Sequence, residues 1–319
     1  MLNLKINWKL KSALSTSLES DTIFGHFCWA LKYLKGEKKL IDFINQLLEG
    51  KACFKLSNGF KKGYIPFSQV IPHSKTFSDR LEVCYRLKKE IKTIDLISIK
   101  KWNDNCNHFN PEIILDNNLD NKEVLLSSKS GVQNHRIIHN YINRLSGTTS
   151  KDGANLFAEE TSFYSSDYEF NSWLKTDYFA LNELKEIFCQ ISVNGFGKDK
   201  NFGRGTFDIL VEESKDFTVV NDCNAWLLIS NCVPCKDDST NVMAEAKVKY
   251  PKTGGDYALK ESPYKYPVYV FTPATIFIGE KEPQGMILRN IHPFNDKIIQ
   301  NLSAYCLPIK ISEELLWQR

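Results

Sequence analysis

The chain has 319 residues, of which 42% are hydrophobic and 25% charged, and its formal net charge is +3. This composition excludes a disordered, collagen-like or coiled-coil chain, and at this length we expect about two domains. No apolar stretch approaches the length of a membrane span, and the first ten residues alternate, unlike a signal peptide. The nine scattered cysteines therefore indicate reduced thiols in a cytoplasmic protein.

The charges are unevenly distributed along the chain. Residues 127–151 contain four Lys or Arg and no carboxylate, whereas residues 152–186 contain eight carboxylates against two lysines. A basic segment beside an acidic one favours one face for a polyanion and another for a protein partner. Two ordinary solvated surfaces are the alternative. The net charge alone is too small to indicate a nucleic-acid-binding protein.

The first third of the chain begins with a clear strand signal. Apolar residues alternate with polar ones over residues 2–11, which predicts a half-buried strand whose open face carries Lys5, Lys9 and Lys11. Ser20 and Asp21 form an N-cap pair and predict a helix ending near Gly36, followed by a second helix over residues 38–49. We expect loops and short strands over 51–80, partial helix over 78–99 and a surface excursion over 103–122.

The middle of the chain predicts a hairpin, a helix and a glycine-rich loop. Turn residues within 145–157 indicate a long hairpin, with strands over 156–164 and 168–174. A helix over 178–193, the loop and a strand over 206–211 follow. The order predicts an α+β fold in which residues 1–213 form a ferredoxin-like (RRM-like) βαββαβ domain with an inserted hairpin.

Residues 214–319 predict a second domain that is short of helix. Strand-like segments at 225–229, 266–271, 276–278 and 286–291 are separated by Pro and Gly. We therefore expect a degraded, β-rich second ferredoxin-like unit, so that the chain is a tandem of two such domains.

The glycine-rich loop over residues 195–205 is the strongest functional signal. Its four glycines favour backbone conformations with positive φ, and the exposed N–H groups of such loops suit phosphate. Lys198, Lys200 and Arg204 add positive charge. The loop follows a helix and precedes a strand, which excludes a Walker A loop and a Rossmann fingerprint. A plain connection between helix and strand is the alternative.

The helix, glycine-rich loop and strand together resemble the signature of the RAMP superfamily of CRISPR RNA-binding proteins. Three further segments are similar to motifs of the fourth subunit of the type III-A Csm effector complex: residues 14–31, the run FKKGYIP at 60–66, and NYINRLSGTT at 140–149 with its hairpin. The resemblance covers most of residues 1–211. Asn194 replaces a glycine found in many relatives, and Ser146 replaces a frequent threonine.

The resemblance implies a non-catalytic subunit that holds the 5′ handle of the guide RNA (crRNA). Its partners would be the large polymerase-like subunit and the backbone RAMP subunits, and the hairpin would be a thumb that intrudes on the guide–target RNA duplex. No cofactor, metal or membrane is implied. The RNA-binding residues predicted from the resemblance and the charges are Lys5, Lys9, Lys11, Ser20, His26, Arg136, Asn143, Arg144, Gly147, Thr148, Thr149, Gly195, Gly197, Lys198, Lys200, Phe202, Gly203, Arg204 and Gly205.

Other interpretations remain open. The superfamily also contains endoribonucleases that process guide precursors, for which His26 is the candidate general base. A third possibility is an RNA chaperone outside CRISPR with a ferredoxin-like core. His135 and His139 are four residues apart, suit one face of a helix and favour phosphate contact over metal. Cys232 and Cys235 form a lone CxxC, which without further ligands favours two ordinary thiols over zinc.

Overall fold

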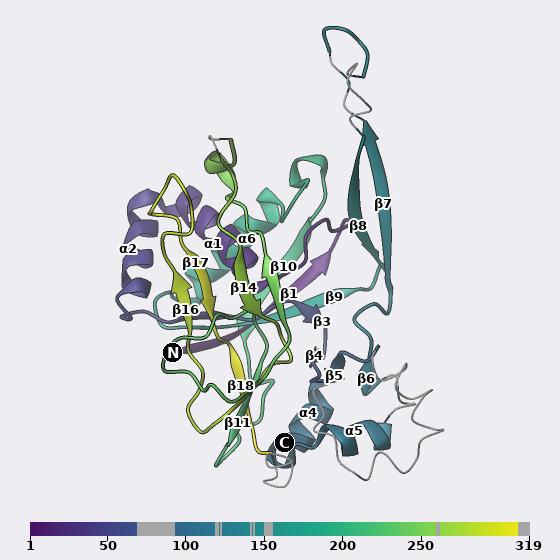
Figure 1. The fold of residues 1–319 in the computed structure, drawn as a ribbon, viewed down its shortest axis with the longest axis vertical. Helices are drawn as coiled ribbons and strands as arrows, with labels where there is room; N and C mark the ends of the chain where they lie inside the picture. Colours follow the sequence, from purple (N-terminus) through teal and green to yellow (C-terminus); the bar gives the residue numbers. More distant parts are fainter. Residues whose placement is uncertain are drawn as a thin grey trace.

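The N-terminal part of the protein is built on one antiparallel sheet. The computed structural model describes residues 1–68, 93–118, 121, 123–140, 142, 144–149, 156–259 and 262–311. The sheet has the order β10-β1-β9-β2, formed by Phe207–Glu213, Leu2–Leu10, Glu169–Thr176 and Phe54–Leu56, and β3 (Phe60–Lys61) also pairs with β9 (Figure 1). The α+β fold is confirmed, with the predicted chain order of strand, helix, strands, helix and strand.

One face of this sheet is covered by two helices, α1 (Ser20–Lys35) and α6 (Leu181–Asn194). Leu4, Ile6 and Trp8 of β1 are fully buried against them, as the alternation in the sequence predicts. The indole Nε1 of Trp8 donates to Ser172 Oγ at 2.8 Å, so its polar atom is satisfied inside the core. Helix α2 (Glu37–Leu48) follows α1 after Gly36, which has the positive φ expected of a helix terminus.

The other face of the sheet packs in part against the C-terminal half of the chain. Trp173 of β9 joins a second core with residues between 220 and 311 and with α4 (Ile99–Asn105), η2 (Cys106–His108) and α5 (Pro111–Asn118). Short strands β4 (Tyr64–Pro66), β5 (Leu96–Ser98) and β6 (Leu125–Leu126) form a small sheet beside them. The prediction of a surface excursion over 103–122 is therefore wrong, since Phe109, Ile114 and Leu115 are buried. Part of the core that buries them comes from residues 220–311, more than 100 residues later in the sequence, so local periodicity does not reveal it.

Residues after 213 form strands, as expected. They are β11 (Ala225–Leu228), β12 (Val242–Met243), β13 (Ala246–Lys249), β14 (Val268–Phe271), β15 (Ile276–Ile278), β16 (Gly285–Leu288), β17 (Gln300–Ser303) and β18 (Cys306–Ile309). Within 214–259 and 262–311 the only helical element is the 3-10 turn η4 (Gly255–Leu259). The β-rich character is confirmed, and the ferredoxin-like interpretation of this unit stays a prediction.

The start of α1 joins the two halves of the chain. The N-cap residue is Glu19, with no side-chain cap, so the predicted cap at Ser20 and Asp21 is displaced by one residue. Ser20 Oγ instead accepts from the backbone N–H of Asn231 at 3.1 Å, and Asn231 Nδ2 donates to Asp21 Oδ1 at 3.0 Å. The polar residues of this helix start are therefore committed to a contact within the protein.

A two-stranded hairpin projects from the body as a long arm (Figure 1). Strands β7 (Val132–Asn140) and β8 (Leu156–Tyr164) pair over nine residues, with β8 at its predicted bounds. The expectation that His135 and His139 share a helix face is wrong, because both lie on strand β7.

No helix in the described part of the chain is long and apolar enough to cross a membrane. Of the segment 78–99, in which partial helix is expected, residues 78–92 lie outside the described residues.

Candidate nucleic-acid interface

The glycine-rich loop connects α6 to β10 and includes the short turn η3 (Lys200–Phe202). Gly195, Gly197, Gly203 and Gly205 all have φ between +65° and +80°, which confirms the predicted backbone conformations. A Cβ on Gly205 would lie 2.0 Å from the carbonyl oxygen of Phe196, whereas a Cβ on Gly203 would meet no atom within 4 Å. The neck of the loop is thus tightly closed and its distal part is open.

Many N–H groups of the loop already have partners within the protein. The backbone N–H of Gly197 donates to His26 Nε2 at 3.0 Å, that of Lys198 to Thr16 Oγ1 at 2.9 Å, and that of Gly205 to the Ala13 carbonyl at 2.9 Å. These donors hold the loop on His26 of α1 and on residues 12–16, the connection that follows β1. They fix its shape and are not free to bind phosphate. Side chains therefore have a larger part in any RNA contact than the sequence indicated.

His26 is a structural neighbour of the loop. Its ring lies 4.5 Å from that of Phe196, centroid to centroid, and its Nε2 accepts the Gly197 hydrogen bond. Burial, and then the positive charge of Lys200, lowers the pKa of His26 to about 3. A neutral ring with an occupied Nε2 lone pair is unsuited to act as a general base near pH 7. The candidate base of the endoribonuclease interpretation is thus committed to holding the loop.

The loop cations converge on a carboxylate of the hairpin. Lys198 Nζ forms an ion pair with Glu159 of β8, and Arg204 Nη1 lies 3.4 Å from Glu159 Oε2. Arg204 Nη1 also donates to Ser15 Oγ at 3.0 Å and to Thr161 Oγ1. We call this the Glu159 cluster. It joins the base of the hairpin, the residues after β1 and the glycine-rich loop.

The pKa values of the two carboxyl groups of this cluster, Glu159 and Asp199, are shifted in opposite directions. The hydrogen bond from Lys198 is the main cause that lowers the pKa of Glu159, with the charges of Lys198 and Arg204 acting in the same direction. Burial, and then the nearby Glu159, raises the pKa of Asp199. His139 Nε2 lies 3.2 Å from Glu159 Oε2. The cluster is therefore close to charge balance, whereas the sequence of the loop alone, with three cations against Asp199, indicated a net positive charge.

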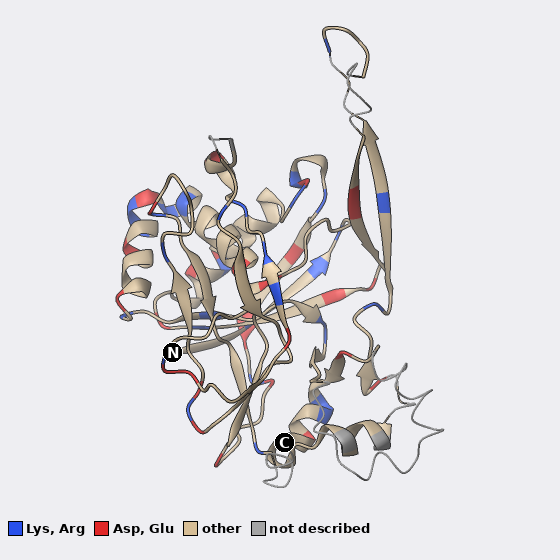
Figure 2. Ribbon diagram, in the orientation of Figure 1, with Lys and Arg blue, Asp and Glu red and all other residues tan. Residues whose placement is uncertain are grey.

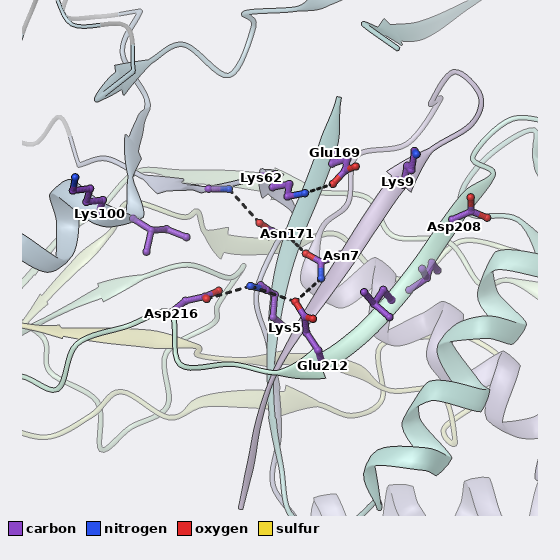
Figure 3. Close-up of a pocket in the computed structure, with 14 residues that line it drawn as sticks. Lys5, Asn7, Lys9, Lys62, Lys100, Glu169, Asn171, Asp208, Glu212 and Asp216 are labelled. Atoms are coloured by element: carbon purple, nitrogen blue, oxygen red, sulfur yellow. Dashed lines mark hydrogen bonds and ion pairs between the residues drawn. The ribbon is translucent and has the colours of Figure 1, made fainter. Parts of the chain in front are cut away.

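The lysines of β1 lie on the face of the sheet that α1 and α6 do not cover. Lys5 and Lys9 line a pocket of about 720 Å³ over β1, β9 and β10, with Lys62 and Lys100 nearby (Figure 3). Lys5 Nζ lies 3.2 Å from Asp216 Oδ1, Lys62 is paired with Glu169, and Lys11 outside the pocket is paired with Asp208.

The charges of this pocket are balanced. Its lining contains four lysines and four carboxylates, Glu169, Asp208, Glu212 and Asp216. The open face of the sheet is therefore a surface of mixed charge rather than an extension of a basic surface.

The remaining predicted residues fall in different places. Arg136 is exposed on β7, opposite Glu160 of β8, and Figure 2 shows basic and acidic bands on the two strands. Arg144, Gly147, Thr148 and Thr149 are exposed beyond the paired strands. Ser20 is buried at the start of α1, and Asn143 lies outside the described residues. The structure thus brings together the loop and His26, and separates them from the hairpin tip and the β1 lysines.

The residues that the sequence analysis missed are those beneath the loop. Ser15, Thr16, Glu159 and Thr161 provide the acceptors that hold it. The run SALSTS at 12–17, directly after the first strand, was a usable signal, since hydroxyl side chains often bind backbone groups. Glu159 gave no such signal, because its role depends on pairing between β7 and β8.

The CxxC cysteines have different environments. Cys232 is buried, and burial raises its pKa well above that of a free thiol, whereas Cys235 is partly exposed. In the portion of the chain described here, no three Cys, His, Asp or Glu side chains are grouped as metal ligands.

Comparison with known proteins gives similarity in structure only. No protein-family model and no curated protein matches the chain. The structure is similar to a chain of a Csm1-Csm4 cassette in complex with cA4, with a TM-score of 0.63 and 11% identity over 98% of this chain and 100% of that one. It is also similar to a chain of a Csm3-Csm4 subcomplex of the type III-A CRISPR-Cas interference complex, with a TM-score of 0.61 and 18% identity over 97% and 100%. Csm4 is the component named in both complexes. The chain therefore shares its fold with chains of these complexes, as the resemblance in the sequence implies, while the tandem ferredoxin-like arrangement stays a prediction.

Proposed function

We propose that this chain is the Csm4 subunit of a type III-A CRISPR effector and acts there as a non-catalytic RNA-binding protein. In this proposal it holds the 5′ handle of the crRNA and joins the large polymerase-like subunit to the backbone RAMP subunits in the cytoplasm. The observation that carries the proposal is the full-length similarity to chains from complexes with both Csm1 and Csm3. A protein that links two kinds of subunit is expected to occur with each.

The exposed groups of the loop and hairpin support contact with RNA. Phe202 is 85% exposed at the outer part of the loop, beside Lys200. On the hairpin, the rings of His139 and Phe157 are stacked at 5.2 Å, and His135 meets Phe163 edge to face. Exposed rings with cations nearby are the usual means of binding unpaired bases without reading their sequence.

The outer part of the hairpin supports the role of a thumb. Ile138, Leu145 and Leu156 are 58–99% exposed, although each is apolar. Exposed apolar groups of this size on a projecting arm favour contact with another molecule. In the proposed assembly that molecule is the guide–target duplex. The division of the chain into a RAMP domain, residues 1–213, and a second domain, residues 214–319, is part of the same proposal.

Purification of the tagged chain from its native host tests the proposal. We expect it to copurify with a large polymerase-like subunit, backbone RAMP subunits and guide RNAs that share one 5′ handle. Sequencing of the bound RNA and mass spectrometry of the bound proteins are the measurements. Heterogeneous RNA without these subunits would contradict the proposal. In parallel, repeat RNA incubated with the isolated chain should stay intact; cleavage that is lost in His26→Ala would establish the endoribonuclease instead.

A further inference from the structure

The two cations that contact Glu159 are held very differently. The Arg204 side chain is 19% exposed, and its Nη1 has Ser15, Thr161 and Glu159 as neighbours. The Lys198 side chain is 55% exposed, and the partners of its Nζ are Glu159 and, at 4.0 Å, Asp199. Arg204 is therefore fixed from several sides, whereas the end of the Lys198 side chain is open to solvent.

The backbone of Lys198 is nevertheless fixed. Its N–H donates to Thr16 Oγ1, and the preceding N–H donates to His26. Four flexible methylenes separate this fixed backbone from Nζ. The ammonium group can therefore turn away from Glu159 towards solvent while the loop keeps its shape.

Glu159 would keep one cationic partner, Arg204, after the departure of Lys198. Its side chain is 7% exposed, so a complete loss of cations would be costly. Arg204 Nη1 lies 3.4 Å from Oε2, and His139 Nε2 lies 3.2 Å from the same oxygen. Arg204 thus remains as the counter-charge, and the ammonium of Lys198 is the cation that the cluster can release.

We propose that Glu159 regulates RNA binding at the glycine-rich loop by competing with an RNA phosphate for Lys198. The inference rests on the proposed function, in which this loop contacts RNA. A phosphate oxygen and a carboxylate oxygen are equivalent anionic acceptors for an ammonium group. In the free protein Glu159 forms an ion pair with Lys198, and an RNA phosphate has to replace Glu159 as the partner of this ammonium group. Arg204 remains with Glu159 and keeps the hairpin attached to the loop.

The size of the effect follows from the salt dependence of phosphate contacts. For single strands, the logarithm of affinity falls with the logarithm of salt concentration by ~0.7 for each phosphate that is neutralised. The contact of Lys198 with one phosphate is therefore worth about fivefold more affinity at 0.1 M salt than at 1 M salt, and this is the most that competition by Glu159 can withhold. Removal of the competing carboxylate should give a gain of this order, confined to low salt.

The test measures binding of a fluorescent single-stranded oligouridylate to the full chain across a range of salt. We expect Glu159→Gln to bind up to about fivefold more tightly at 0.1 M salt, with a steeper salt slope. The gain should disappear in the Lys198→Ala background. Asp167→Asn is the matched control, because it removes a charge from an exposed residue that follows the hairpin and does not contact Lys198.

Each outcome has one meaning. If the unsubstituted chain does not bind RNA, the proposed function fails. If it binds and Glu159→Gln changes nothing, or gains equally without Lys198 or in Asp167→Asn, competition by Glu159 is refuted. Should Glu159→Gln not fold, Glu159→Asp keeps the buried charge but withdraws it from Lys198. That variant should show a smaller gain in the same direction, and an unchanged affinity would refute the proposal.

Discussion

Glu19 and Glu159 each pair with two cations, but the Glu19 network holds two parts of the chain together, whereas the Glu159 cluster can exchange a partner. Glu19 precedes α1 and contacts Lys247 and Lys249 of β13. Glu159 lies on the hairpin and contacts Lys198 and Arg204 of the glycine-rich loop. Both carboxylates connect segments that are distant in sequence.

The surroundings of the two glutamates differ. Near Glu19, Lys249 is only 17% exposed and also lies 2.6 Å from Asp21, whose side chain is fully buried. Asn231 Nδ2 donates to both carboxylates, and Gln300 donates to Asp21. The Glu159 cluster has the more exposed lysine, Lys198 at 55% against 41% for Lys247 of the Glu19 network. A closed network of this kind holds two parts of the chain together, whereas an open one can exchange a partner.

The largest effect should come from Lys249→Ala, which opens the closed network. Glu19 and the buried Asp21 would lose the lysine that contacts both, and breaking a buried ion pair costs about 4 kcal/mol of unfolding free energy. Urea denaturation measures the loss. Lys247→Ala is the control, because Lys247 is 41% exposed and should cost under about 1 kcal/mol. Equal losses in the two variants would remove the distinction.

Acid should weaken the same network. Burial raises the pKa of Glu19, but the charges and hydrogen bonds of Lys249 and Lys247 outweigh it and lower the pKa from 4.5 to about 2. A carboxylate with a lowered pKa stabilises the folded state above the unfolded pKa, and this contribution is lost as pH falls from 4.5 towards 2. The loss amounts to about 3 kcal/mol. Denaturation at a series of pH values should show it, and Glu19→Gln should flatten the profile over this interval.

The smallest effects should distinguish the two cations of the open cluster. Arg204→Ala removes the partly buried cation that contacts Glu159 and should lower the free energy of unfolding by about 2 kcal/mol. This is less than the loss of a fully buried ion pair, because Lys198 still pairs with Glu159. Lys198→Ala removes an exposed side chain and should cost less than about 0.5 kcal/mol. Thermal unfolding of both variants checks the order. A larger loss for Lys198→Ala would show that Lys198, and not Arg204, holds the hairpin.

Where local patterns decided the structure, the sequence was a sufficient guide. The alternation in β1, the apolar spacing of α6 and the glycines of the loop each predict their own element, and all three occur. Strand β7 was missed because it projects from the body. Val132, at its start, packs against the core, but the rest of the strand extends away from it, and the apolar pair Ile137 and Ile138 breaks any alternation that would mark a strand.

The candidate site could be predicted only in part. The sequence identified Lys198 and Arg204 as cations of the loop, but their acceptor Glu159 belongs to a strand whose register is set by β7. The same limit applied to Ser20, which has the residue type of a helix cap but accepts a hydrogen bond from Asn231, more than 200 residues later. Which hydrogen bond or ion pair a polar side chain forms thus depends on contacts between distant segments, which the local sequence does not reveal.

The central position of β1 has a consequence for synthesis of the chain. Leu4 pairs with Leu174 on one side, and with Glu213 on the other. At ~5–20 residues per second, roughly ten to thirty seconds pass on the ribosome before the first of these partners is made. During that time the N-terminal strand leaves the ribosome unpaired. Its alternating lysines, which face the open side of the finished sheet, then discourage pairing with other nascent chains.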